Sequence, residues 1–252
     1  MSSSPIELYM FEPAFGLPVS ESPPATKVQL YCHLTGRDYI ARLGDTRRSP
    51  NHMIPYVRWP DGTWQAESWD ILERLEAESD EPLDENLDRE ALRSGRALAE
   101  AVELICYDAC LYDRFVRPEG WALQRPILRA YVAQLAPWIA WPMIPLVVWA
   151  VRRKQRDRAH VTMADISSGQ ARVRELVQEV ARRLEQAPFL CGDRPSTIDC
   201  AIWATLLHLA ATPVMSTSRD AVREQPLVMD WIARVAGLAG LEIGSLGMQR
   251  EP

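Results

Sequence analysis

Strand-like and helix-like spacings of apolar residues are segregated along this chain, and this segregation limits its fold more than any other feature. Short strand-like runs occur only within the first 66 residues, mixed with one helical segment. An acidic, proline-containing segment at 78–88 then makes a natural linker, and everything after it has helical spacing. We therefore expect an α/β domain over residues 1–79 and an all-α domain over residues 88–252.

The first part predicts the element order of a thioredoxin-like domain. A helix from 23 to 34 ends at Gly36, the residue type that most often follows a helix. The run 60–62 (Pro-Asp-Gly) joins two strands as a hairpin, and Ser68 caps a helix that ends near Glu78. The resulting order is β-α-β followed by β-β-α. The strands are expected at 6–11, 38–43, 53–59 and 63–66.

The second part is predicted as a series of helices. Thr162 with Asp165, and Ser196 with Asp199, resemble capping boxes in which Asp replaces the usual Glu. The tail from Gly237 onward is rich in glycine. The helices are expected at 89–116, 123–136, 163–187, 197–211 and 227–235.

The net charge argues against a nucleic-acid partner, and the length of the longest apolar stretch argues against a membrane span. The net charge of -6 argues against nucleic acid, because phosphate binding requires a basic surface. The longest apolar stretch, 136–151, contains three prolines and is shorter than the roughly 20 residues that span a bilayer. The N-terminus lacks the basic and apolar regions of a secretory signal. We expect a cytoplasmic protein without membrane association.

Cysteine and histidine usage predicts neither disulfides nor metal. The five cysteines have no CxxC spacing, which favours a reducing compartment. The four histidines lack the paired spacing of metal ligands, so no metal is expected.

Four short segments, in this order and spacing, resemble the glutathione transferase family. The resemblance covers roughly residues 6–236 and is greatest for branches whose active residue is a serine or cysteine at the start of the first helix, including the metaxin-like and failed-axon-connections-like group. It implies a thioredoxin-like domain that holds glutathione, an all-helical domain after it, and a homodimer. The segments are 22–27 (SPPATK), 53–57 (MIPYV), 61–68 (DGTWQAES) and 189–199 (FLCGDRPSTID).

The resemblance assigns glutathione binding to two of these segments. It implies a cis Ile54–Pro55 bond, with the backbone of Ile54 pairing with the cysteinyl part of glutathione. It also implies that Ser68 binds the γ-glutamyl carboxylate and that Glu67 accepts from the γ-glutamyl ammonium. A helix N-terminus suits a carboxylate, because its unpaired N–H groups carry partial positive charge. The alternatives are an ordinary edge-strand proline at Pro55 and a simple helix cap at Ser68.

By the same resemblance, thiol activation falls to Ser22, which precedes Pro23 at the start of the first helix. A thiol with a pKa of about 8.5 needs roughly 3 kcal/mol to become mostly thiolate near neutral pH. One hydrogen bond to an ion contributes about 1.5–3 kcal/mol and the helix terminus about 0.3–1 kcal/mol, so no dedicated base is required. Alternatively, Ser22 is only a helix cap, with Ser20 as a nearby rival. Tyr9 is expected in the core, because it should face the other side of the strand from Met10.

Two departures from the family pattern affect the site. The family often has a lysine before the proline, where it helps hold the glycyl carboxylate, and here His52, Arg47 or Arg48 could replace it. The loop 12–21 is longer than usual, and Phe15 in this loop could shape a substrate pocket.

The helical half should supply the remaining wall of the pocket. By the resemblance, Tyr107 and Cys110 on the first long helix are candidates to face the electrophile, although aromatic residues at helical spacing are more often core. Trp138, Trp141 and Trp149 lie in a proline-interrupted stretch. The basic run 152–158 is expected to be a solvated helix face, with a lipid-facing patch as the alternative.

The resemblance implies an enzyme that ionises glutathione and adds it to a small hydrophobic electrophile such as an epoxide, an activated alkene or a halide. One alternative is a non-catalytic binding or assembly protein of the metaxin-like type. Another is a glutathione-dependent isomerase. Thiol reduction is the weakest alternative, because a serine at position 22 cannot form a mixed disulfide.

Overall fold

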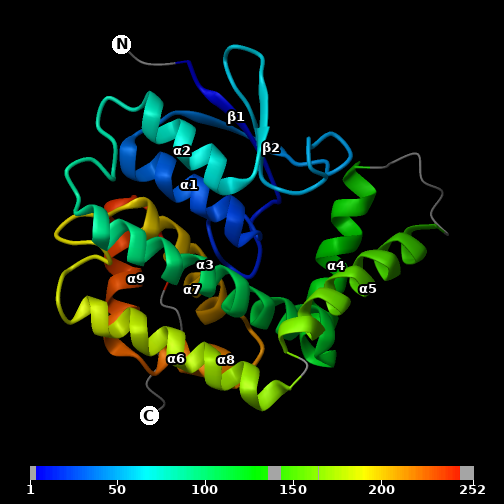
Figure 1. Cartoon of the computed structure of the whole chain (residues 1–252). Coiled ribbons are helices and arrows are strands. Elements are labelled where there is room, and N and C mark those ends of the chain that lie inside the picture. Colours follow the sequence, from blue (N-terminus) through cyan, green and yellow to red (C-terminus); the bar gives the residue numbers. More distant parts are fainter. Residues whose placement is uncertain (1–3, 136–142, 164, 245–252) are drawn as a thin grey trace.

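The N-terminal half is built on a four-stranded sheet with the strand order β2-β1-β3-β4 (Figure 1). The computed structural model describes residues 4–135, 143–163 and 165–244. β2 pairs with β1 in parallel, whereas β3 is antiparallel to both β1 and β4. This is the expected thioredoxin-like order. The elements are β1 (Ile6–Met10), α1 (Pro23–Thr35), β2 (Tyr39–Leu43), β3 (Tyr56–Arg58), β4 (Trp64–Ala66) and α2 (Ser68–Glu78).

Side chains alternate between the two faces of the sheet along β1, and the apolar ones show which face the helices cover. Ile6 and Leu8 are fully buried and join α1 and α2 in one apolar cluster. The intervening Tyr9 is half-buried, and its ring stacks on that of Tyr56 at 4.6 Å, with Trp64 at 5.4 Å. Tyr9 does face the other side of the strand from Met10, as expected, but the prediction that it is core is wrong, because that face carries an aromatic row and the helices cover the face of Met10.

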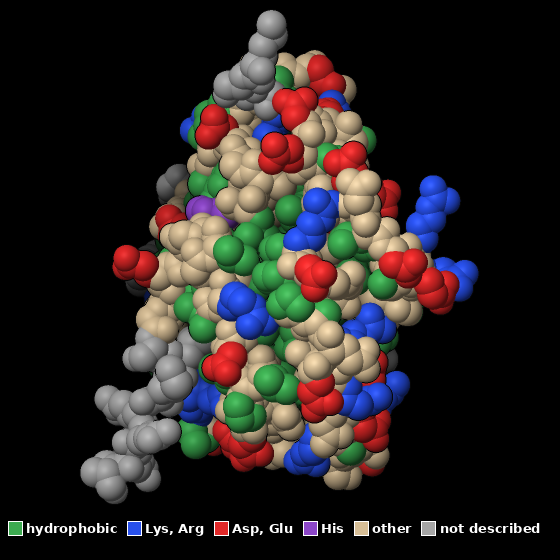
Figure 2. Space-filling view, turned by 90° about the vertical axis from the view of Figure 1, so that its left-hand side faces the viewer, with side chains coloured by type: hydrophobic (Ala, Val, Ile, Leu, Met, Phe, Trp, Pro, Cys, Tyr) green, Lys and Arg blue, Asp and Glu red, His purple; other side chains and the backbone are tan. Residues whose placement is uncertain are grey.

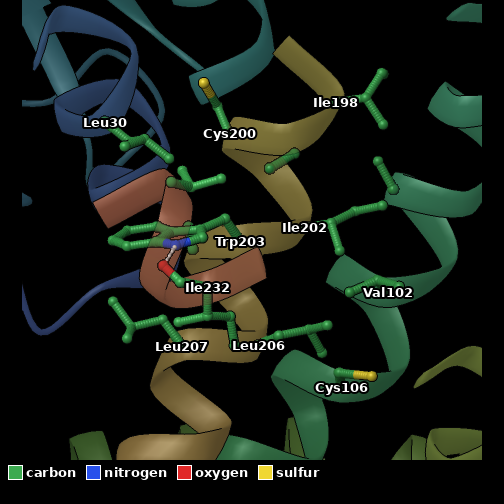
Figure 3. Packing of buried hydrophobic residues seen from close by; sticks show 14 of the residues in the cluster. Leu30, Val102, Cys106, Ile198, Cys200, Ile202, Trp203, Leu206, Leu207 and Ile232 are labelled. Carbon is green, nitrogen blue, oxygen red and sulfur yellow. Dashed lines mark hydrogen bonds between the residues drawn. The ribbon is translucent and has the colours of Figure 1, made fainter. Parts of the chain in front are cut away.

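The C-terminal half is helical throughout its described elements. α7 occupies its centre, and Figure 3 shows Trp203 of α7 between Leu30 of α1 and Val102 of α3. The indole Nε1 of Trp203 donates to the carbonyl oxygen of Ile232 at 2.9 Å, so this buried polar group is satisfied. The elements are α3 (Arg89–Leu111), η1 (Tyr112–Val116), α4 (Pro118–Leu135), α5 (Ile144–Thr162), α6 (Ile166–Leu184), α7 (Thr197–Ala211), α8 (Thr217–Arg223) and α9 (Pro226–Leu238).

Several predicted helix boundaries are corrected by the structure. The long helix expected at 89–116 ends at Leu111 and passes into η1, a single π-helical turn. α4 begins at Pro118 rather than at 123, with a proline tolerated in its first turn. The basic run 152–158 lies in α5 and is mostly exposed, as expected of a solvated helix face, but the bounds of α5 and the helix α8 were not predicted. Trp138 and Trp141 lie outside the described residues.

The two predicted capping boxes have different outcomes. Ser196 and Asp199 form a complete capping box at the start of α7, as expected. Thr162 instead ends α5, and Asp165 alone caps α6 by accepting from the backbone N–H of Ser167 at 3.1 Å. The prediction of a capping box at 162–165 is wrong, because a preceding helix already includes Thr162.

Charged side chains of both signs are distributed over the visible surface. On the face shown in Figure 2, acidic and basic side chains are interspersed, with apolar side chains between them. Among the described helices, none is both long and apolar enough to cross a membrane.

Candidate active site

The strand register brings the predicted glutathione-binding segments to one edge of the sheet. Tyr9, near the end of β1, pairs with Tyr56 at the start of β3, and Tyr56 pairs with Ala66 at the end of β4. The Ile54–Pro55 segment therefore enters the sheet where Glu67 and Ser68 leave it. β1 ends at the same edge, and its connection leads directly to Ser22.

Ser22 is the N-cap of α1, but its hydroxyl does not cap the helix. The side chain makes no capping hydrogen bond, although the carbonyl oxygen of Ser22 accepts from the N–H of Thr26 at 2.9 Å. The N–H of Ser22 donates to the Oγ of Ser20 at 3.2 Å. Ser20 is completely buried and its Oγ is engaged by this contact, whereas Ser22 is 5% exposed. The Ser22 hydroxyl therefore stays the candidate to contact a ligand at the positive end of the helix.

Glu67 and Ser68 form the turn that starts α2. Glu67 has a φ of 67°, a left-handed conformation that is rare for residues with a side chain and is often found at ligand-binding positions. Its Oε1 accepts from the Nδ2 of Asn51 at 2.7 Å, which fixes the carboxylate beside the loop before Pro55. Ser68 is the first residue of α2 and is 9% exposed. The N-terminal N–H groups of α2 thus lie next to an oriented carboxylate.

The Ile54–Pro55 bond is cis, as expected. Ile54 lies just outside the sheet ladder, which begins at Tyr56. Its side chain packs so closely on Gly44 that a Cβ at position 44 would overlap it.

The three candidates for the missing lysine have different environments. Arg47 is ion-paired with Asp45 at 2.8 Å and donates to the carbonyl oxygen of Leu135 at 3.1 Å. Arg48 is largely exposed, 3.9 Å from the same aspartate. The Nδ1 of His52 lies 3.2 Å from the carbonyl oxygen of Thr46, so Nδ1 is the donor and Nε2 remains for a ligand.

α4 closes one side of this edge, which the sequence did not indicate. The hydroxyl of Tyr131 donates to the carbonyl oxygen of Gly44 at 2.8 Å, and its ring meets Phe11 edge-on at 4.8 Å. The side chain of Gln124 donates to Oε1 of Glu21, beside Ser22. Helical spacing could place these side chains on α4, but no local signal shows which segment they face.

The predicted pocket residues do not all come together. The ring of Phe15 lies 4.9 Å from the guanidinium carbon of Arg114, close to the 20–22 segment. Tyr107 is half-buried beside Arg158, and burial raises the pKa of its hydroxyl. Cys110 is fully buried, with Sγ 4.0 Å from the carbonyl oxygen of His208, and burial raises its thiol pKa. The structure thus gives Cys110 no exposed surface for a substrate.

None of the five cysteines forms a disulfide, and all are buried. In the described part of the chain, no three His, Cys, Asp or Glu side chains cluster so that they could hold a metal ion. The absence of a metal stays a prediction.

Two family models match consecutive parts of the chain. The Glutathione S-transferase N-terminal domain matches residues 23–120, and the Glutathione S-transferase, C-terminal domain matches residues 150–234. The chain is also 26% identical over 246 residues to the isoprene-epoxide–glutathione S-transferase of Rhodococcus sp. (strain AD45). That alignment covers 91% of this chain and 97% of the relative.

Solved structures share the fold. The beta-etherase LigF from Sphingobium sp. strain SYK-6 is 18% identical with a TM-score of 0.62, over 94% of this chain and 95% of that one. A glutathione S-transferase from Methylobacterium radiotolerans, solved with glutathione sulfonate, is 20% identical with a TM-score of 0.56, over 92% and 91% of the two chains. At these identities the likeness shows the fold alone.

Proposed function

The chain belongs to the glutathione S-transferase superfamily, and we propose on this basis that it is a serine-type enzyme that ionises the glutathione thiol at Ser22 and adds the thiolate to a small epoxide. The observation that carries the proposal is the shared sheet edge. The elements that carry Ser22, the Ile54–Pro55 segment and Glu67–Ser68 begin or end there, which supports the roles proposed for them.

The geometry supports separate roles for the N-termini of α1 and α2. The start of α2 would hold the γ-glutamyl end, with the N–H groups and hydroxyl of Ser68 on the carboxylate and Glu67 on the ammonium. The backbone of Ile54 would pair with the cysteinyl unit. The thiol would then lie near the start of α1, where the Ser22 hydroxyl donates to the sulfur. His52 is our candidate to contact the glycyl carboxylate, because its Nδ1 donates to Thr46 and, in the imidazolium form, its Nε2–H can donate to a carboxylate.

The reaction needs no further cofactor. The thiolate sulfur attacks an epoxide carbon, the carbon–oxygen bond breaks, and the alkoxide takes up a proton from water. Lowering the thiol pKa by about two units requires roughly 3 kcal/mol, which one charge-assisted hydrogen bond and a helix terminus nearly supply.

The choice of an epoxide among the electrophiles rests on the Rhodococcus relative. Its name specifies isoprene epoxide, and the similarity extends over nearly all of both chains. Tyr107 and Phe15 are the pocket residues that we retain, whereas the burial of Cys110 speaks against a contact with substrate.

Conjugation kinetics test the proposal. With glutathione and isoprene epoxide as substrates, Ser22→Ala should lower kcat about 10–100-fold with little change in the KM for glutathione, because it removes a hydrogen bond to the ionised sulfur. Ser68→Ala should instead raise the KM for glutathione about tenfold and change kcat less. Initial rates over a range of glutathione concentrations separate the two effects.

Ser167→Ala is the matched control, because Ser167 also lies at the start of a helix, far along the chain in α6. It should leave both constants unchanged. Full activity in Ser22→Ala would remove the role of Ser22, and no conjugation by the unchanged chain would remove the proposed activity. In the latter case, glutathione binding measured by calorimetry would distinguish a binding protein of the metaxin-like type from a chain that has lost the site.

Four expectations stay predictions: the homodimer, the cytoplasmic location, the domain boundary at 79–88 and the resemblance to the metaxin-like branch.

A further inference from the structure

A buried polar cluster lies directly behind Ser22, and thiol activation as described above does not use it. Its members are Arg114 of η1, His208 of α7 and Thr26 of α1, together with the backbone of Ser20 and Glu21. The side chain of Arg114 is 5% exposed and His208 is 1% exposed. Buried groups of this kind are costly unless fully paired, so their arrangement needs a reason.

The hydrogen bonds define the tautomer of His208. The hydroxyl of Thr26 donates to the carbonyl oxygen of Ser20 at 2.9 Å, so it accepts from the Nε2–H of His208 at 3.0 Å. The Nδ1 of the imidazole then accepts from the Nη2 of Arg114 at 3.1 Å. Burial and the adjacent guanidinium hold the pKa of His208 well below its usual value. His208 is therefore a neutral acceptor that orients Arg114.

The other end of Arg114 reaches the residue before Ser22. Its Nη1 donates to the carbonyl oxygen of Glu21 at 3.0 Å, and this carbonyl belongs to the peptide unit that continues into Ser22. Arg114 is available for this contact because it lies in the π-helical turn η1, and such turns are frequent at functional sites. The guanidinium thus stands behind the start of α1.

We propose that Arg114 is a positioning residue for Ser22, which fixes the Glu21–Ser22 backbone and adds positive charge behind the N-terminus of α1. His208 keeps the guanidinium in place without adding a second charge. The inference rests on the proposed function only in taking Ser22 as the reactive position.

Two carboxylates oppose Arg114 at this site. The carboxylate of Glu21 lies 3.9 Å from the Nη1 of Arg114 and accepts from Gln124, which holds it toward α4. The second is Asp113, next to Arg114 in η1, where burial raises the pKa to about 6, so that it is mostly ionised at physiological pH. Burial also raises the pKa values of three neighbouring groups that are neutral at physiological pH, Tyr107, Cys110 and Tyr131. The field at Ser22 is therefore set by Arg114, the two carboxylates and the end of α1.

A cysteine at position 22 reports the electrostatic field there without glutathione, through the pKa of its thiol. In a Ser22→Cys chain, the rate of alkylation by iodoacetamide as a function of pH gives the pKa of the introduced thiol, because the thiolate is the reacting form. Position 22 is itself only 5% exposed, and Cys191 is comparable at 7%, so alkylation of the chain with Ser22 unchanged gives the background that is subtracted. We expect this pKa to lie below the ordinary value of about 8.5.

Substitutions in the Ser22→Cys background should shift the pKa of the introduced thiol in opposite directions. Arg114→Gln should raise it by about one unit, since a nearby positive charge is lost. Arg114→Lys should raise it by less, because the charge is kept while the two-pronged contact to Glu21 and His208 is lost. Glu21→Gln should lower it.

Arg152→Gln is the matched control. The Nε of Arg152 also donates to a backbone carbonyl oxygen of η1, that of Phe115 at 3.1 Å, but it makes no contact with the 20–22 segment. It should leave the pKa of the introduced thiol unchanged. Circular dichroism and thermal unfolding check that each variant is folded.

An equal pKa of the introduced thiol in the Arg114→Gln, Arg152→Gln and otherwise unsubstituted backgrounds would overturn the proposal. If Arg114→Gln does not fold, the order Glu21→Gln, then unchanged, then Arg114→Lys in rising pKa supports the proposal, and no shift in either variant overturns it. The assay contains no glutathione, so its failure removes the role of Arg114 alone. The absence of conjugation by the unchanged chain would instead remove the proposed function and leave the measured order of pKa values intact.

Discussion

The burial of Asp113 predicts how the stability of the protein depends on pH. It is 3% exposed, accepts from the Oγ of Ser216 at 2.6 Å, and links η1 to the start of α8. Burial raises the pKa of its carboxyl to about 6, above the value in an unfolded chain. The folded state therefore binds a proton more tightly than the unfolded state, and this contribution to stability is complete below about pH 4 and is lost as the pH rises through 6.

Asp113→Asn tests this sign, because asparagine keeps the shape of the side chain and does not titrate. The free energy of unfolding of the unchanged chain minus that of the variant should fall by about 2 kcal/mol between about pH 4.5 and pH 7. Urea unfolding at a series of pH values measures the difference. A difference that is constant over this range would contradict the buried, protonated carboxyl.

At the scale of elements, two aspartates that serve helix starts should differ in importance. Asp199 is completely buried and accepts from four donors: the N–H of Leu190, the N–H and Oγ of Ser196, and the Nε1 of Trp231. It joins α7 to α9 and to the loop before α7. Asp165 caps α6 at the surface through Ser167 and Ser168.

Asp199→Ala should therefore lower the free energy of unfolding by at least about 3 kcal/mol, because it leaves buried donors unpaired. Asp165→Ala is the matched comparison and should cost about 1 kcal/mol, the usual value for an exposed cap. Chemical denaturation of both variants gives the two numbers. Equal costs would show that burial adds nothing at Asp199.

At the scale of the whole molecule, the two halves are joined by a buried ion pair. The Nζ of Lys27 in α1 lies 2.6 Å from Oε1 of Glu103 in α3, and the indole of Trp69 in α2 donates to Oε2 at 2.6 Å. The side chain of Lys27 is 1% exposed, and burial lowers its pKa to about 8. Glu103 thus binds both helices of the sheet domain to the helical domain.

Glu103→Ala should destabilise the protein by about 3 kcal/mol, since it leaves the buried ammonium of Lys27 and the partly buried indole N–H of Trp69 without this partner. Glu100→Ala, one turn earlier on α3, removes only an exposed pair with Arg96 and should cost less than about 1 kcal/mol. Because the halves share this pair, urea unfolding should give one transition by fluorescence and by circular dichroism. Two separate transitions, or equal costs for the two variants, would contradict a coupling of the halves through Glu103.

Local sequence determined much of the fold and predicted the residues of the candidate glutathione site. Period-2 and period-3.6 spacing located the four strands, α1, α2 and α7, because such spacing records which side of an element is buried. The Ser196–Asp199 capping box was visible in four residues, because its donors and acceptors are neighbours in the chain. Ser22, Pro55 and Ser68 stand next to turns and helix starts, whose chemistry is equally local.

Only the tertiary structure decided the contacts that join distant segments. The start of α5 escaped prediction because Pro145 obscures the beginning of a helix that packs on α4, and only its basic run was expected on a helix. The links from Arg114 to Glu21, from Thr26 to His208 and from Tyr131 to Gly44 each cross more than eighty residues of chain. No residue spacing encodes such a meeting, because it depends on which faces pack together once the elements have formed. The sequence by itself therefore predicted a candidate glutathione site, and the packing of the two halves decided what surrounds its residues.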